Sequence, residues 1–162
     1  KAEGRPLEDM PPVPRTARHF TPLLNNSLVR DLDDMKGYVA SGGMQIVDAR
    51  PKGRFEGTEP EPRPGLRAGH IPGSKNVPSS MILNADGTLK SKPELEQIFR
   101  DAGIDPQKPV VTTCGSGVTA SMLSLALSVI GQTNAAVYDG SWAEWGQETL
   151  DTPVETGPAK SG

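Results

Sequence analysis

Cys114 is the only cysteine among the 162 residues, and it stands between a strand pattern and a helix pattern. Residues 110–113, Val-Val-Thr-Thr, predict a buried strand. Residues 114–119 predict a tight loop, and residues 120–130 predict a helix that Gly131 ends. A thiol at such a junction lies near backbone N–H groups without an intrahelical partner and near the positive end of the helix dipole. The pattern therefore favours a nucleophilic thiolate.

The residues after the cysteine have the composition of an anion-binding turn. Gly115 and Gly117 allow the backbone N–H groups to turn inward around the sulfur. That environment can lower a cysteine pKa from ~8.5 towards neutrality. A solitary cysteine is more often a small buried hydrophobe, so the prediction of a nucleophile depends on the loop and not on Cys114 alone.

Strand and helix patterns alternate along residues 19–150, the extent that we expect for the folded domain. Such alternation predicts an α/β fold in which a central parallel β-sheet has helices on both faces. Ligands of open sheets bind at the carboxyl ends of the strands, which is where Cys114 stands. Besides the cysteine unit, we expect an extended segment at 19–24, a helix at 27–40, strands at 45–50 and 75–78, a helix after Ser91, a strand at 135–138 and a helix from Ser141.

Local patterns give three finer expectations. The first helix has apolar residues on one face, and the helix after the cysteine has an apolar stretch that predicts core. The spacing of Ser91 and Glu94, and of Ser141 and Glu144, fits a capping box. The apolar residues in question are Leu28, Leu32, Met35 and Val39 in the first helix, and Leu123, Leu125, Leu127 and Ile130 in the second.

Length, charge and cysteine content limit the class of protein. A chain of 162 residues is most consistent with one domain. The net charge of −3, with mixed signs, does not favour nucleic acid or an anionic membrane as a partner. No apolar run approaches the ~20 residues that span a bilayer. One cysteine excludes an internal disulfide and fits a reducing compartment.

The two ends of the sequence differ from its middle. Residues 1–18 carry four prolines among charges, which predicts an extended linker left over from a preceding domain. The first residue is lysine and not methionine, which also indicates a piece of a longer protein. Residues 151–162 are polar and contain prolines, and we expect a flexible C-terminal tail there.

Five segments together resemble the C-terminal rhodanese domain of two-domain sulfurtransferases, and most closely the branch that uses 3-mercaptopyruvate. The resemblance covers roughly residues 20–147, in order and with compatible spacing. The matching segments are Ile-Val-Asp-Ala-Arg (46–50), Gly-Arg-Phe with the Glu-Pro-Glu-Pro-Arg stretch (53–63), Gly-His-Ile-Pro-Gly with Asn-Val-Pro (69–78), Cys-Gly-Ser-Gly-Val-Thr-Ala (114–120) and Tyr-Asp-Gly-Ser-Trp with Glu144 and Trp145.

The resemblance implies a sulfurtransferase reaction. The Cys114 thiolate would attack the sulfur of 3-mercaptopyruvate, release pyruvate and keep a persulfide. A thiol acceptor such as thioredoxin or glutathione, or cyanide, would then take the outer sulfur. The resemblance implies no metal and no organic cofactor. The loop that would hold the anionic persulfide consists of Gly115, Ser116, Gly117, Val118 and Thr119.

The loop also bears on the substrate. In thiosulfate-preferring relatives the two residues after the cysteine are typically arginine and lysine, whereas here they are Gly115 and Ser116. The neutral pair favours 3-mercaptopyruvate over the dianion thiosulfate. A carboxylate is best bound by a planar bidentate donor, and the resemblance assigns that role to Arg54 and Arg63.

Other residues have structural interpretations that we favour. His70, between glycine and isoleucine in a turn, is expected to be a structural hydrogen-bonding residue rather than an acid or base. Asp48 and Arg50 fit either a catalytic role or a structural ion pair, and we favour the pair. Trp142 and Trp145 are expected to pack the last helix onto the sheet.

Two other functional classes stay in view. Phosphatases and arsenate reductases of related fold need an arginine six residues after the cysteine to bind the oxyanion. That position is Ala120, so we set this class aside.

The second class is a non-catalytic rhodanese binding module. It is more plausible for this chain than for a two-domain parent, because polar groups of the missing N-terminal rhodanese domain would complete the site. We expect reduced turnover and an exposed apolar face where that domain would sit. The compartment is expected to be cytoplasmic, with mitochondria as the alternative.

Overall fold

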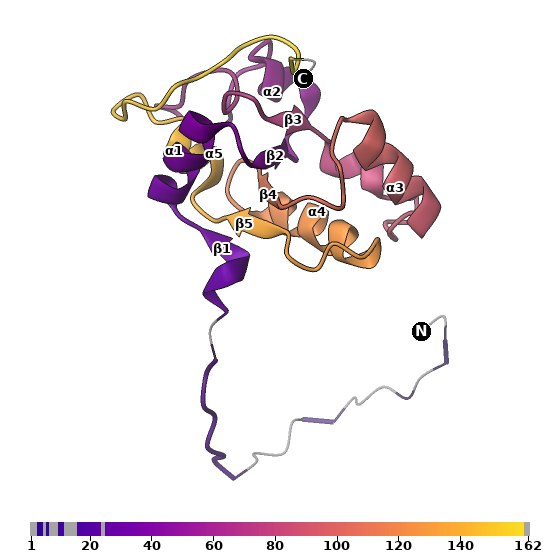
Figure 1. Cartoon of the computed structure of the whole chain (residues 1–162). Helices are drawn as coiled ribbons and strands as arrows, with labels where there is room; N and C mark the ends of the chain where they lie inside the picture. The colour runs from indigo at the N-terminus through magenta and orange to yellow at the C-terminus, as the bar shows by residue number, and fades with distance from the viewer. Residues whose placement is uncertain (1–2, 5, 7–9, 12–15, 24, 161–162) are drawn as a thin grey trace.

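Five parallel strands form the centre of the protein, in the order β1-β5-β4-β2-β3 (Figure 1). The computed structural model describes residues 3–4, 6, 10–11, 16–23 and 25–160. The strands are β1 (Val29–Arg30), β2 (Gln45–Asp48), β3 (Lys75–Asn76), β4 (Val110–Thr113) and β5 (Ala136–Tyr138). The helices are α1 (Leu32–Ser41), α2 (Lys52–Glu56), α3 (Lys92–Asp101), α4 (Val118–Val129) and α5 (Ser141–Trp145), with 3-10 turns at Asn26–Leu28 and Ser79–Ile82.

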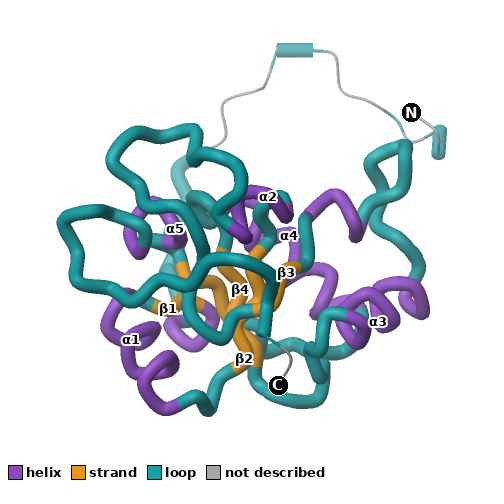
Figure 2. Tube along the Cα trace, turned by 90° about the horizontal axis from the view of Figure 1, so that it is seen from above, coloured by secondary structure: helices purple, strands orange, loops and turns teal. Residues whose placement is uncertain are grey.

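The sheet separates two apolar cores, one on each face. In β2 and β4 successive side chains point to opposite faces, so Val47 and Val110 enter one core while Ile46 and Val111 enter the other. Residues of α3 and α4 complete the first core, and residues of α1 and α5 complete the second. Figure 2 shows α1 and α5 on one side of the strands and α3 on the other. The predicted α/β class with helices on both faces is confirmed.

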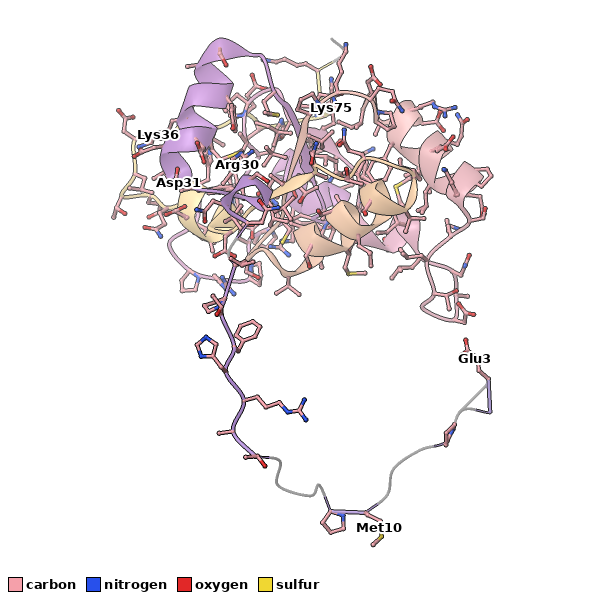
Figure 3. The ribbon with its side chains drawn as sticks, turned by 60° about the horizontal axis from the view of Figure 1, so that its bottom comes forward. Glu3, Met10, Arg30, Asp31, Lys36 and Lys75 are labelled. Atoms are coloured by element: carbon pink, nitrogen blue, oxygen red, sulfur yellow. The ribbon has the colours of Figure 1, made fainter. Side chains whose placement is uncertain are left out.

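The first helix starts later than the sequence suggested. Asp31 and Asp34 form a capping box, in which each side chain accepts a hydrogen bond from the backbone N–H of the other, at 2.9 and 3.3 Å. This cap fixes the helix start at Leu32. Leu28 therefore lies in a 3-10 turn before the edge strand and not on a helix face. Figure 3 shows Asp31 at the beginning of α1.

Helix α4 confirms three of its four expected core residues. Leu123 and Leu127 are fully buried and Ile130 is 6% exposed, but Leu125 is 57% exposed, so its assignment to the core was wrong. The reason is helical phase, because Leu125 lies two residues from each buried leucine and thus on the opposite side of the helix. The helix also begins at Val118, two residues sooner than expected.

One of the two predicted capping boxes forms. Ser91 and Glu94 cap α3 as expected. The box at Ser141 was wrong, because the Ser141 hydroxyl donates to the carbonyl of Tyr138 and the Glu144 carboxylate accepts from the Tyr138 hydroxyl. The Ser141 and Glu144 side chains therefore bind Tyr138 instead of capping the helix. The short helix α2 and the two 3-10 turns were not predicted.

The segment after Asp151 differs from the expected flexible tail. Residues 151–160 run back along the domain, in yellow in Figure 1. The Arg67 guanidinium donates to the carbonyl of Thr152 at 2.7 Å, and the Trp145 indole donates to the carbonyl of Pro153 at 2.8 Å. His70 and Glu155 exchange backbone hydrogen bonds at 2.8 and 3.0 Å. These partners supply ordering contacts that composition does not reveal. Residues 161–162 lie outside the described part.

Only part of the expected linker can be compared with the structure. Residues 1–2, 5, 7–9 and 12–15, which include Pro12 and Pro14, lie outside the described residues. Residues 16–23 are exposed and form no strand, and the last residue of the extended segment expected at 19–24 also lies outside. Figure 3 shows Met10 away from the body of the domain. No helix in the described part is both long and apolar enough to cross a membrane.

Candidate active site

Cys114 directly follows β4 at the carboxyl edge of the sheet. The cysteine residue is 2% exposed, and its side chain borders a pocket of about 350 Å³. The pocket lies between the cysteine loop and the segment that follows β2. Its lining consists of Ala49, Arg50, Pro51, Arg54, Glu61, Pro62, Arg63, Leu66, Ser79, Cys114, Gly115, Ser116, Val118 and Thr119.

Opposing effects act on the Cys114 thiol. Burial raises its pKa, whereas hydrogen bonds from the Thr119 hydroxyl and from the backbone N–H groups of Ser116, Ala120 and Thr119 lower it. The hydrogen bonds prevail, and the pKa lies below the ordinary cysteine value. The Ser116 N–H lies 3.4 Å from Sγ. The donors come from the loop and from the N-terminus of α4, so the sequence prediction of inward-turned amides is consistent with this geometry.

Gly117 is favoured by its backbone conformation, and Gly115 by close packing. Gly117 has φ +85°, a backbone conformation that residues with a side chain rarely adopt. A Cβ there would also lie 3.2 Å from the Asp139 carbonyl oxygen. A Cβ on Gly115 would lie 3.1 Å from Nη2 of Arg54. The absence of a side chain at 115 thus allows an arginine to approach the loop.

The structure brings the two predicted substrate-binding arginines to the same pocket as Cys114. Arg54 forms a double contact with the Glu61 carboxylate, with Nε 3.2 Å from Oε1 and Nη2 2.5 Å from Oε2. Its side chain keeps 23% of its surface exposed. Arg63 is exposed, and no hydrogen bond or ion pair of its side chain occurs among the described residues. Arg54 is therefore fixed, while Arg63 has a free guanidinium group at the pocket.

A buried charge network lies behind Arg54, and the sequence predicted only part of it. Arg50 contacts Asp48 and Glu61, each at 2.7 Å, and all three side chains are about 1–2% exposed. The Arg50 guanidinium also lies 4.3 Å from the ring centre of Trp142, a cation–π contact. The expected Asp48–Arg50 ion pair is confirmed, and Glu61 joins it to Arg54. The two Glu residues before Arg63 in the sequence were the only signal for this link.

The remaining expectations concern packing, and the structure confirms them. His70 is 1% exposed, its Nδ1 lies 2.8 Å from the Phe55 carbonyl oxygen, and its ring stacks on Phe55 at 3.8 Å. Burial lowers its pKa, and the hydrogen bond and ring stacking give His70 the packing contacts that a structural role predicts. Trp142 and Trp145 are buried between α5 and the sheet.

A five-stranded parallel sheet with a buried cysteine in a loop at its carboxyl edge defines an α/β domain with a candidate cysteine site. Within that class, the model of the rhodanese-like domain matches residues 31–148. The chain therefore belongs to the rhodanese-like domain family.

Two sulfurtransferases are similar in sequence to most of this chain. The 3-mercaptopyruvate sulfurtransferase of Homo sapiens is 43% identical over 126 residues, which are 78% of this chain and 42% of that protein. The thiosulfate sulfurtransferase of Gallus gallus is 43% identical over 143 residues, which are 88% of this chain and 48% of that protein. The chain thus spans a little under half the length of these relatives.

A solved structure agrees with the sequence comparison. The crystal structure of SseA from Escherichia coli, described with the fold and catalytic mechanism of 3-mercaptopyruvate sulfotransferases, superposes with a TM-score of 0.65 at 39% identity. The match covers 76% of this chain and 45% of that one.

Proposed function

We propose that this domain is a sulfurtransferase that takes sulfur from 3-mercaptopyruvate through a persulfide on Cys114. The thiolate attacks the substrate sulfur, a new S–S bond forms, and the C–S bond breaks. The electron pair of the broken bond leaves with pyruvate, which takes up a proton as its enolate becomes a ketone. A thiol acceptor then attacks the outer sulfur and restores the Cys114 thiolate.

One observation carries the proposal: a cysteine whose pKa is lowered borders the same pocket as two arginines. The lowered pKa increases the fraction of thiolate, the nucleophilic form of the cysteine, at a given pH. The amide donors that stabilise the thiolate also suit the anionic persulfide. The names of the relatives point to the same chemistry.

The pocket favours a monoanionic donor with a carboxylate. Arg54 and Arg63 are the proposed carboxylate ligands, because a guanidinium group can bind both carboxylate oxygens. Ser116 offers a hydroxyl in place of a further positive charge. Thiosulfate is the second candidate donor, since a thiosulfate sulfurtransferase is also 43% identical. A dianion, however, finds no lysine or arginine in the loop at 115 and 116.

The proposed partners are a small thiol or thioredoxin as acceptor and an N-terminal rhodanese domain beside the pocket. An apolar stripe on α4 supports the second: Val118 is 71%, Leu125 57% and Val129 44% exposed. Val118 also lines the pocket, so a domain that covered this stripe would lie next to Cys114. The proposed compartment is the cytoplasm, with mitochondria as the alternative, since a mitochondrial thiosulfate/3-mercaptopyruvate sulfurtransferase of Arabidopsis thaliana is 43% identical over 129 residues.

Pyruvate release tests the reaction directly. The chain is mixed with excess 3-mercaptopyruvate without an acceptor, and pyruvate is measured with lactate dehydrogenase. We expect about one pyruvate per chain, followed by slow turnover when dithiothreitol is added. The Cys114→Ser variant should release none. Equal release by both proteins, or none by the wild type, would contradict the proposal, and the second result would favour a binding module.

A further inference from the structure

The first turn of α5 is hydrogen-bonded to the cysteine loop at three points. The Trp142 N–H donates to the Cys114 carbonyl at 2.8 Å, and the Ala143 N–H donates to the Gly115 carbonyl at 2.9 Å. In the reverse direction, the Cys114 N–H donates to the Ser141 hydroxyl at 3.3 Å. The loop is thus connected to α5 through both donors and acceptors.

These bonds determine the direction of the loop amides. A trans peptide is planar, so its C=O and the N–H of the next residue point in opposite directions. Because the carbonyls of Cys114 and Gly115 accept hydrogen bonds from α5, the N–H groups of Gly115 and Ser116 must point away from α5. The Ser116 N–H indeed lies 3.4 Å from Cys114 Sγ. The Ser116 N–H that faces the sulfur therefore depends on the bond that the Gly115 carbonyl accepts from Ala143 on the other side of the loop.

Ser141 holds this arrangement in two ways. It is the only non-glycine residue with positive φ, at 51°, in the described part of the chain. That conformation is uncommon for a residue with a Cβ and indicates a position that its surroundings fix. Its hydroxyl is buried, donates to the Tyr138 carbonyl at 2.9 Å and accepts from Cys114.

We propose that Ser141 is a positioning residue for the nucleophile. Its hydroxyl and its left-handed backbone place the first amides of α5 on the loop carbonyls and so aim the Ser116 N–H at the sulfur. The proposal rests on the proposed role of Cys114, but it concerns the state of the thiol and not the transfer of sulfur. Loss of Ser141 should therefore weaken the thiolate even without any donor substrate.

The test is the pH profile of Cys114 alkylation by iodoacetamide, which reports a single thiol because the chain has one cysteine. Ser141→Ala removes the hydroxyl and keeps the unfavourable backbone. Ser141→Gly removes the hydroxyl and relieves the backbone, so it keeps the test available if the alanine variant does not fold. The matched control is Ser74→Ala, since the Ser74 hydroxyl is also buried and also donates to a carbonyl three residues back, at 2.6 Å, away from the loop.

We expect the midpoint of the profile to move to higher pH in both Ser141 variants, with alkylation at pH 7 slowed about threefold to tenfold, the loss of roughly one weak hydrogen bond to a charged group. Ser74→Ala should lower the melting temperature and leave the midpoint in place. A midpoint unchanged in a folded Ser141 variant, or shifted equally by Ser74→Ala, would overturn the proposal. If wild type forms no persulfide while the Ser141 variants still shift the midpoint, the proposed function fails and this inference holds.

Discussion

At the scale of single residues, the chemistry depends on hydrogen bonds that overcome the cost of burying a thiolate. Burial alone would raise the pKa of Cys114, and only the surrounding donors reverse that effect. Among them, the Thr119 hydroxyl lowers the pKa of Cys114 most, and it is the side-chain donor of the set. A single substitution can remove it without altering the backbone.

Thr119→Val should raise the pKa of Cys114, because the valine keeps the shape of threonine and lacks its hydroxyl. A depressed thiol pKa means that thiolate reactivity is present above this pKa and lost as pH falls through it. The variant should lose reactivity at a higher pH than wild type. At pH 7 we expect alkylation slowed about tenfold, the value of one hydrogen bond to a charged group. Ser121→Ala is the control, since its hydroxyl donates to Val118 instead. Equal profiles for Thr119→Val and wild type would remove Thr119 from the thiolate environment.

Arg54→Ala and Arg63→Ala should each raise the KM for 3-mercaptopyruvate about tenfold or more, since each removes a charge-assisted hydrogen bond to the carboxylate. Arg63→Ala is the cleaner variant, because Arg54 also pairs with buried Glu61. Steady-state pyruvate formation measures the effect, and circular dichroism checks the fold. Arg63→Lys, which keeps charge and lacks the planar fork, should recover only part of the loss. An unchanged KM in both alanine variants would exclude the arginines from substrate binding.

At the scale of secondary structure, sequence patterns succeeded where an element's partners are close in the chain. The strand–loop–helix unit around Cys114 and the Ser91–Glu94 cap were predictable because their signals are local. The Ser141–Glu144 spacing failed because the Ser141 hydroxyl binds the Tyr138 carbonyl and the Cys114 N–H, while the Glu144 carboxylate binds the Tyr138 hydroxyl. Glu61 was missed for the same reason, since its meaning depends on Arg50 and Arg54 in the folded state.

Helix α4 offers a direct test of the burial pattern. Leu123→Ala should lower the free energy of unfolding by about 2–5 kcal/mol, because it leaves a cavity in the core. Leu125→Ala, two residues away and 57% exposed, should change it by less than about 0.5 kcal/mol. Urea unfolding of the two variants measures both values. Similar losses in the two proteins would contradict the exposed position of Leu125.

At the scale of the whole molecule, the C-terminal segment forms part of the domain. Thr152→Ala should lower the free energy of unfolding by about 1–3 kcal/mol, since its buried hydroxyl bonds to the Trp145 carbonyl at 2.6 Å and to Arg67. Thr149→Ala is the matched control, because that hydroxyl is exposed and contacts only Gln147 among the described partners, at 3.5 Å. Urea unfolding should separate the variants. Equal free energies of unfolding for the two variants would instead support the flexible tail that the composition of residues 151–162 predicted.

The central claim, that Cys114 carries the transferred sulfur, is tested most directly by intact-mass spectrometry. The chain is measured before and after 3-mercaptopyruvate, with thiosulfate in parallel and Cys114→Ser as control. We predict a gain of about one sulfur atom, ~32 Da, on wild type only and larger with 3-mercaptopyruvate than with thiosulfate. A gain that persists in Cys114→Ser, or no gain from either donor while Cys114 remains open to alkylation, would contradict the claim.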